Sequence, residues 1–329
     1  MTLLLAAVVV LLAGAALALV LSRWPRAAST VGCASALLAA SLGIPFAVRA
    51  LGRAPRAWVT VAWHVPNGAF VVGCDRSSAF FLVPIFALGA VAAVYGYDYL
   101  LAFRARKSLG VPWAAFNLCI ASMALVVTAR HAVLFLVAWE LMALTSYVLV
   151  TFEEEKADVQ RAGWLYLIGA HVGVALLITM FLVLGAARGT LLFEPGALDG
   201  RTRTAVLLLA LTAFGIKAGL VPLHVWLPEA HASAPSHVSA FMSGVIIKLG
   251  VYGIIRTTLL VGPAPLWWGR LLIVVGLTSA LFGIALATYQ RDLKRVFAYS
   301  SIENVGLIVL GIGLGFWGEA AGHPTIAAL

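Results

Sequence analysis

Long apolar stretches alternate along the chain with short polar connections that contain glycine or proline. A membrane-spanning helix needs about 20 mostly apolar residues, and ten stretches come close to that length. They are residues 2–22, 28–48, 78–98, 112–129, 131–152, 162–185, 203–221, 237–260, 268–289 and 296–316. The pattern predicts an all-α fold, a polytopic transmembrane bundle of about ten helices.

The first stretch is predicted to be a true membrane span and not a secretory signal peptide. A signal peptide carries positive charge before a short apolar core and small residues at its cleavage site. Here no charged residue precedes Leu3, whereas Arg23 and Arg26 follow the apolar run. The Lys and Arg residues of the connections fall about equally on both sides, so their count does not fix the orientation of the bundle.

One connection, residues 54–77, is predicted to form a short hairpin outside the membrane. Val59 and Val61 occupy alternating apolar positions, and the turn-forming sequence Pro-Asn-Gly follows at residues 66–68. Alternating apolar residues beside such a turn are typical of a β-hairpin. The later acidic run at residues 153–156 is predicted to be a solvated loop.

Composition narrows the class of protein. Of the 329 residues, 63% are hydrophobic and 11% are charged, and the mean hydropathy is +1.03. Soluble domains have about 45–50% apolar and about 25% charged residues, so a soluble enzyme, a disordered chain and a nucleic-acid-binding domain are excluded. The net charge of +9 comes from Lys and Arg scattered between apolar runs, as flanks of membrane helices are. No nucleic-acid partner is expected.

The cysteines predict no metal or cluster site. Cys33, Cys74 and Cys119 are far apart and form no CxxC pair, so neither a zinc ribbon nor a four-thiolate iron–sulfur cluster can be built from this chain alone. Three unpaired thiols in apolar surroundings are expected, with no cofactor on this chain.

Three ionisable residues lie inside predicted spans. Glu140 and Lys248 fall near the middle of theirs, and Lys217 falls four residues before the end of its span. A charge at the centre of a membrane helix costs roughly 2.5–3.5 kcal/mol on insertion scales, and such residues usually mark ion or proton paths. A structural Lys–Glu pair is the alternative for the set, and snorkelling of the side chain is an alternative for Lys217.

A broken helix is predicted near residues 217–235. Pro222, Pro228 and Pro235 follow Lys217 closely, and a proline removes a helical hydrogen bond. Interrupted helices are tolerated in membranes only where they are buried in protein or line a cavity, and they mark binding sites in transporters. A lysine just before the break is therefore a candidate for proton transfer.

The remaining candidates for a proton relay are less specific. They are His171, His224, His231, His237 and Glu303. A lone histidine such as His171 is also typical of a helical core, and Glu303 is either an intramembrane acid or exposed at the interface. Haem ligation by His224 and His237 is disfavoured, because the prolines between them forbid one continuous helix. A metal site of His224, Glu229, His231 and His237 is also disfavoured against a relay or a hydrated loop.

Several long motifs resemble the antiporter-like membrane subunits of respiratory complex I and its relatives. They are WELMALTSY at residues 139–147, GIKAGLVPLHVWLPEAH at 215–231 and DLKRVFAYSS at 292–301. Residues 228–256 and the phrase SIENVG at 301–306 are closer to the hydrogenase-4 component B and formate hydrogenlyase subunit 3 branch. The resemblance runs collinearly from about residue 70 to the end.

The resemblance implies a central proton path through three residues of this sequence. The family uses a glutamate in its fifth helix, matched by Glu140, and a lysine in a broken seventh helix, matched by Lys217. A lysine or histidine of its eighth helix is matched by Lys248. The family also places the N-terminus outside, which agrees with Arg23 and Arg26 on the inner side.

The resemblance also suggests a division of the chain. Residues 1–110 would hold N-terminal membrane helices and the hairpin, 111–260 a first antiporter-like repeat, and 261–329 the start of a second, inverted repeat. The family has about fourteen or more helices, so this sequence is expected to be the N-terminal part of such a fold.

The expected function is a non-catalytic, proton-translocating membrane subunit of a complex I-like or membrane-bound hydrogenase complex. Its expected partners are other membrane subunits, a soluble redox arm, lipid and protons, with sodium as a possible second ion. The expected location is the cytoplasmic (inner) membrane of a bacterium or archaeon. The alternatives are an Mrp-type sodium/proton antiporter subunit and a structural anchor for a hydrogenase.

Overall fold

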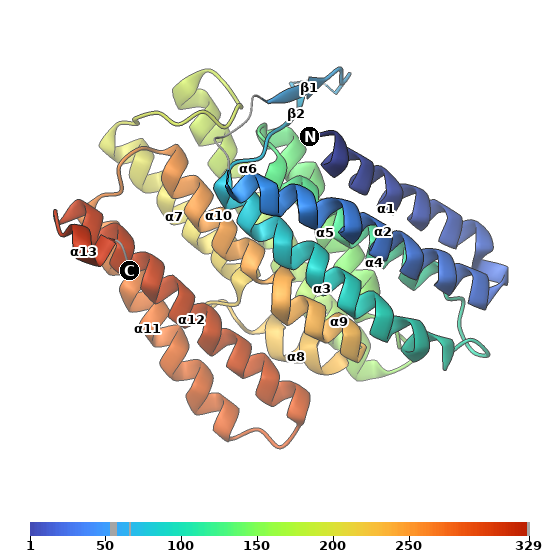
Figure 1. Ribbon diagram of the computed structural model, residues 1–329. Helices are drawn as coiled ribbons and strands as arrows, with labels where there is room; N and C mark the ends of the chain where they lie inside the picture. The colour runs from blue at the N-terminus through green and yellow to red at the C-terminus, as the bar shows by residue number, and fades with distance from the viewer. Residues whose placement is uncertain (53–57, 66, 328–329) are drawn as a thin grey trace. The chain divides into compact units, whose positions relative to one another are not determined.

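The computed structural model describes residues 1–329 except 53–57, 66 and 328–329, and it is mostly helical. Its elements (Figure 1) are α1 (Thr2–Val20), α2 (Pro25–Leu51), β1 (Val59–Val61), β2 (Phe70–Val72), α3 (Arg76–Leu101), α4 (Gly110–Thr128), α5 (Ala132–Val150), α6 (Ala157–Arg188), α7 (Gly200–Ala218), α8 (Trp226–Ser233), α9 (Ser236–Phe241), a π-helical turn (Met242–Ile246), α10 (Lys248–Leu260), α11 (Leu266–Thr288), α12 (Leu293–Ala320) and α13 (Pro324–Ala327).

Nine helical segments within the described ranges are long and apolar enough to cross a membrane. They account for nine of the ten predicted spans and confirm the predicted polytopic helical fold. The tenth prediction, 203–221, corresponds to α7, which is helical but carries Arg201, Arg203 and Lys217 within 19 residues. With these three charges, α7 is less apolar than an ordinary membrane-spanning helix.

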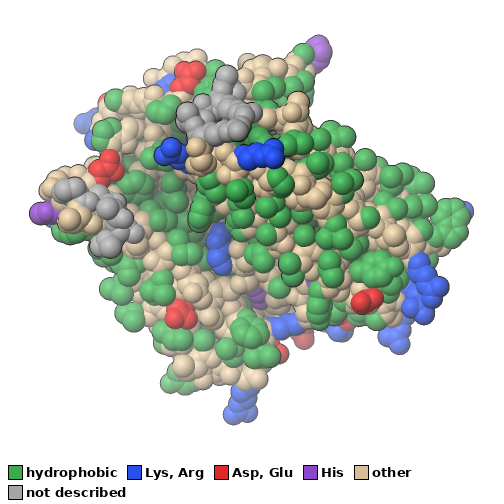
Figure 2. Space-filling model, viewed as in Figure 1, with side chains coloured by type: hydrophobic (Ala, Val, Ile, Leu, Met, Phe, Trp, Pro, Cys, Tyr) green, Lys and Arg blue, Asp and Glu red, His purple; other side chains and the backbone are tan. Residues whose placement is uncertain are grey.

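Large apolar side chains are exposed along most of these helices. Val20, Phe80 and Val91 are each more than 60% exposed, and Figure 2 shows hydrophobic side chains across the visible face with charged ones scattered among them. A soluble protein rarely exposes so much contiguous apolar surface. The chain is an integral membrane protein.

Two compact units make up the fold. Unit 1 comprises residues 1–160 and 234–245, and unit 2 comprises residues 161–233 and 246–329. In unit 1, α1, α2, α3 and α4 pack against one another, and α9 packs on α3 and α5. In unit 2, α7 packs on α10, and α12 packs on α8 and α11. The sequence-based division at residues 110 and 260 remains a prediction.

Part of the 54–77 connection of unit 1 is a two-stranded antiparallel hairpin in which Val59 lies opposite Val72. Pro66, on which the turn prediction depended, lies outside the described residues. The end of the hairpin is held by the α4–α5 connection, where the Arg130 backbone N–H donates to the Val71 carbonyl at 2.8 Å. The buried Arg130 guanidinium also forms an ion pair with Asp75, the N-cap of α3.

The acidic run after α5 lies in a loop, as the sequence predicts. Glu155 is exposed, and its carboxylate pairs with the Lys107 ammonium at 2.8 Å. The hydrogen bond from Lys107 is the main cause that lowers the pKa of Glu155 below its ordinary value. Lys107 also donates to the Phe152 carbonyl, so this lysine ties the α3–α4 connection to the end of α5.

Aspartate N-caps and close glycine packing explain much of unit 2. Asp199 caps α7 by accepting from the Arg201 and Thr202 backbone N–H groups, and Asp292 caps α12 by accepting from the Arg295 N–H, as short acidic side chains at helix starts do. In Figure 1, α11 and α12 lie side by side. A Cβ at Gly276 of α11 would lie 2.4 Å from the Leu310 nitrogen of α12. Small residues permit this close approach.

Replacing Gly250 by alanine should separate α10 from α7 and lower the free energy of unfolding by about 1–3 kcal/mol, as overpacking does. The added Cβ would lie 2.5 Å from the Phe214 carbonyl oxygen and 2.7 Å from the Ala218 nitrogen, both backbone atoms of α7. The thermal midpoint in detergent measures the effect. Gly311→Ala is the matched control, because a Cβ there meets nothing within 4 Å, and an equal loss in both variants would contradict the prediction.

Candidate functional site

Lys217 lies in the last turn of α7 and is almost completely buried, with 4% of its surface exposed. Its ammonium donates a hydrogen bond to the Tyr166 hydroxyl of α6 at 2.9 Å. The same nitrogen lies 5.0 Å from the centre of the Tyr166 ring, a distance at which a ring face attracts a cation. The predicted lysine is thus buried in the protein and is held by a neutral phenol.

The helix break after Lys217 is present, but it begins earlier than the prolines predict. The α7 helix ends at Ala218, and Gly219 follows with φ of 75° in the left-handed region. The Leu220 N–H then donates to the Gly215 carbonyl at 3.0 Å, as in a glycine-terminated helix. Gly219, which lacks a side chain, therefore ends the helix, and Pro222 lies inside the break with a cis peptide bond.

One of the two other predicted breaks is wrong. Pro228 is the third residue of α8, where the N–H that proline lacks has no helical partner to lose. Pro235 does separate α8 from α9, since it is the N-cap residue of α9. The segment after the first break is therefore helical through Pro228.

Trp226, the first residue of α8, links α8 to the end of α7 across the helix break. Its indole N–H donates to the Ile216 carbonyl at 2.7 Å. The indole ring packs edge-on against the Tyr166 ring, with the ring centres 5.1 Å apart. One side chain therefore contacts both the end of α7 and the residue that holds Lys217. A second tie is the Val221 N–H, which donates to the Ser279 hydroxyl of α11 at 3.0 Å.

Lys248 lies in the middle of the span Ser236–Leu260, as the sequence predicts, but that span is not one regular α-helix. Lys248 begins α10 directly after the π-helical turn Met242–Ile246, and π-turns are frequent at functional sites. Its side chain is half-buried. Burial is the main cause that lowers the pKa of the His231 imidazole in α8 to about 4, and the charges of Lys248 and Lys294 contribute to the same shift.

The α8 helix is fixed to the start of α12 by an ion pair. The Arg295 guanidinium lies 2.9 Å from the Glu229 carboxylate. His224, in the break, packs edge-on against Phe282 of α11 with the ring centres 5.6 Å apart, and its Nδ1 has no hydrogen-bond partner among the described residues. The broken segment is thus held by α11 and α12.

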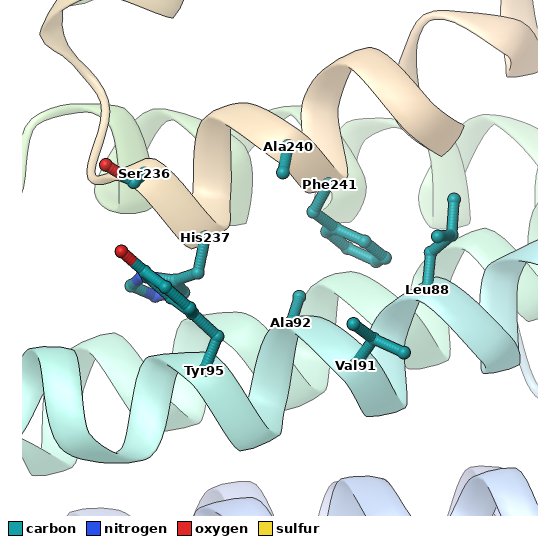
Figure 3. Close-up of a pocket in the computed structure, with 8 residues that line it drawn as sticks. All are labelled: Leu88, Val91, Ala92, Tyr95, Ser236, His237, Ala240 and Phe241. Atoms are coloured by element: carbon teal, nitrogen blue, oxygen red, sulfur yellow. The ribbon is translucent and has the colours of Figure 1, made fainter.

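His237 belongs to unit 1 and lines a mostly apolar cavity of about 360 Å³ between α3 and α9. Figure 3 shows its ring beside Tyr95 at one end of the cavity, with Phe241 toward the other. The imidazole is 4% exposed and packs near the rings of Tyr99 and Phe116, at 5.4 and 6.2 Å between ring centres. Aromatic neighbours surround this histidine.

The other predicted residues are more dispersed. Glu140 is half-buried on α5 of unit 1, Glu303 is half-buried on α12, and His171 is exposed on α6, where its Nδ1 lies 2.9 Å from the Leu167 carbonyl of its own helix. Glu140 and Lys217 belong to different units, so their pairing stays a prediction. In the described part of the chain, no three His, Cys, Asp or Glu side chains gather as a metal site.

Two residues at the lysine site were not predicted from the sequence. Tyr166 lies in an apolar helix about 50 positions before Lys217, and aromatic residues in such helices are equally typical of packing. Trp226 lies in the motif at residues 215–231, but its position in the sequence does not show that its indole N–H donates to the Ile216 carbonyl. These groups come together only when the chain between α7 and α8 folds back.

Comparison with known proteins identifies the family. The model of the NADH:quinone oxidoreductase/Mrp antiporter transmembrane family matches residues 129–324. The chain belongs to this family. The matched range contains Glu140, Lys217 and Lys248, so the three predicted path residues lie inside the family's own segment.

The similar curated proteins include bacterial hydrogenase subunits. The chain is 46% identical over 258 residues to an uncharacterised protein of Mycobacterium tuberculosis, and the aligned part covers 78% of this chain and 40% of that protein. It is 38% identical over 261 residues to hydrogenase-4 component B of Escherichia coli, covering 78% and 38%. Formate hydrogenlyase subunit 3 of the same species is 32% identical over 257 residues, covering 77% and 40%.

Solved structures share the fold. The Mrp complex of a Dietzia species has a chain that matches with a TM-score of 0.81 and 24% identity, covering 98% of this chain and 36% of that one. Respiratory complex I of Thermus thermophilus has a chain with a TM-score of 0.72 and 21% identity, covering 98% and 69%. Together with the curated relatives, these matches confirm the predicted resemblance. The sequence spans about 40% of the first of those relatives.

Proposed function

We propose that this chain belongs to a proton-translocating membrane subunit of a complex I-like or membrane-bound hydrogenase complex. The observation that carries the proposal is Lys217, buried at 4% exposure next to a helix break, inside the segment that matches the family. Charged residues within membrane segments are retained where they serve ion or proton movement. The subunit relays protons between ionisable side chains and water.

The surroundings of Lys217 support a relay over a static anchor. The described hydrogen bond of its ammonium goes to the neutral hydroxyl of Tyr166. A neutral acceptor stabilises a charged amine less than a carboxylate does, so this contact is weaker than the ion pair expected of a static anchor. In the proposed order, a proton reaches the helices of Glu140 and Lys217 and then passes through water to Lys248.

The proposed setting is a multi-subunit complex in the inner membrane of a bacterium or archaeon. Relatives named hydrogenase-4 component B and formate hydrogenlyase subunit 3 support partners of two kinds, other membrane subunits and a soluble redox arm. Lipid would cover the exposed apolar faces of the helices. No cofactor is assigned to this chain.

The test uses inverted membrane vesicles that contain the full-length protein in its native complex. Hydrogen, formate and NADH are supplied in turn as electron donors, and a pH-sensitive dye reports proton uptake. We expect proton uptake that depends on electron transfer and that an uncoupler abolishes. Electron transfer with no uptake from any donor would contradict the proposal.

An Mrp-type sodium/proton antiporter is the second candidate, favoured by the family description and by the fold of the Dietzia Mrp complex. The same vesicles separate the two functions. Proton uptake driven by electron transfer in sodium-free buffer supports the redox-linked pump. Sodium movement driven by an imposed pH gradient, without any electron donor, supports the antiporter.

A further inference from the structure

Tyr166, Trp226 and Lys217 form one packed cluster in unit 2. The phenol accepts a hydrogen bond from the ammonium at 2.9 Å, and its ring lies 5.0 Å from the same nitrogen. From this contact the geometry points to Tyr166 and Trp226 as positioning residues that set how readily Lys217 holds its proton. The inference deepens the proposed function and rests on it.

The Tyr166 hydroxyl stabilises the positive charge of Lys217. A hydroxyl oxygen that accepts from an ammonium favours the protonated lysine, because hydrogen bonds to charged groups are stronger than neutral ones. This effect is strengthened by burial, and Tyr166 is 2% exposed. Tyr166 therefore offsets part of the cost of keeping a charged lysine in the interior.

Trp226 fixes the position of the Tyr166 ring relative to α7. Trp226 packs edge-on against the Tyr166 ring at 5.1 Å, and its indole N–H donates to the Ile216 carbonyl at 2.7 Å. Ile216 directly precedes Lys217. The indole thus fixes the phenol ring and the last turn of α7 together, and it stands at the first position of α8. A shift of α8 would move the phenol relative to the ammonium.

The same unit of the fold contains a matched comparison site. The Tyr252 hydroxyl accepts from Arg256 Nε at 3.0 Å, and its ring lies 5.2 Å from the guanidinium carbon. The contact has the same chemistry as that of Tyr166, but an arginine stays protonated throughout the physiological range. A Tyr252→Phe variant removes the same kind of buried hydroxyl contact, but from Arg256, which takes no part in proton transfer. It therefore serves as the control for Tyr166→Phe.

The test compares Tyr166→Phe, Trp226→Phe and Tyr252→Phe in the full-length protein within its native complex. Dye-reported proton uptake is followed across pH. Phenylalanine keeps the ring and removes only the hydroxyl, so the protonated lysine is disfavoured. We expect the alkaline limb of the rate profile to move to lower pH by about one unit in Tyr166→Phe. Trp226→Phe should move it less and in the same direction, and Tyr252→Phe should leave it in place.

A second readout separates this inference from the proposed function. Acetic anhydride reacts with neutral amines, and mass spectrometry of the Lys217 peptide gives its labelling rate at fixed pH. Tyr166→Phe should raise that rate about tenfold, in proportion to the neutral fraction. An unchanged rate and an unchanged profile, or equal changes in Tyr252→Phe, would overturn the inference. Faster labelling in a protein that transports nothing would leave the inference standing and refute the proposed function.

Discussion

Replacing Lys217 by methionine should reduce coupled proton uptake to the background level while electron transfer in the soluble arm continues. Methionine keeps an unbranched side chain of similar length and removes the charge. Because Lys217 is 4% exposed and lies in a well-packed last turn, the loss of charge should not destabilise the fold. A relay cannot pass a proton through a thioether, so the effect is a loss of transport and not a change in affinity.

The measurement is dye-reported proton uptake in inverted vesicles, normalised to the rate of electron transfer. Lys156→Met is the matched control, since Lys156 is exposed and pairs with Glu153 in the loop after α5. Uptake in that control should match the unsubstituted complex. Normal pumping by Lys217→Met would refute the proposed role. If the Glu140→Gln, Lys217→Met double variant also assembled and pumped normally, the chain would be a structural anchor.

The sequence predicted the helical fold because membrane helices have a simple physical signature. Each needs about 20 apolar residues, since every backbone polar group must be satisfied within the segment in lipid. The exception is α7, whose Arg201, Arg203 and Lys217 lie in a helix only 19 residues long. Length and hydropathy locate such a segment, and the contacts of the charged groups with the rest of the protein decide whether it is tolerated.

The break was predicted in the right place for an incomplete reason. Prolines were expected to end α7, yet the helix ends at Gly219, where φ is 75°. A glycine at the end of an apolar segment predicts a helix end as well as a proline does. The prediction relied on the three nearby prolines and overlooked Gly219. Pro228 was expected to break the helix but lies within it, because a proline in the first turn of a helix costs no hydrogen bond.

The lysines were predicted, but their partners were not. A charge in an apolar run stands out in a single sequence, whereas Tyr166 looks like any aromatic residue of a membrane helix. Its distance of 2.9 Å from the Lys217 ammonium results from the packing of α6 on the end of α7. Contacts between residues so far apart in the sequence depend on the whole fold, and no periodic pattern of hydrophobic residues in the sequence reveals them.

Replacing Lys248 by methionine should also lower coupled proton uptake by more than tenfold. Lys248 begins α10 directly after the π-helical turn, and its charge acts together with that of Lys294 on the buried His231. Removing the amine takes away the group that, in its neutral form, is proposed to accept the proton from the region of Lys217. Electron transfer should again continue, because the substitution leaves the packing of α10 on α7 intact.

Comparison with Lys294→Met tests whether Lys248 acts as an acceptor or only as a source of positive charge. Both lysines act electrostatically on His231, but Lys294 is in the first turn of α12 and lies 3.5 Å from the Ala232 carbonyl. If Lys248 accepts the proton, Lys248→Met should lower uptake by more than tenfold and Lys294→Met should lower it much less. Equal effects would mean that both lysines tune His231 by charge alone, and the relay would then have to pass through the imidazole of α8.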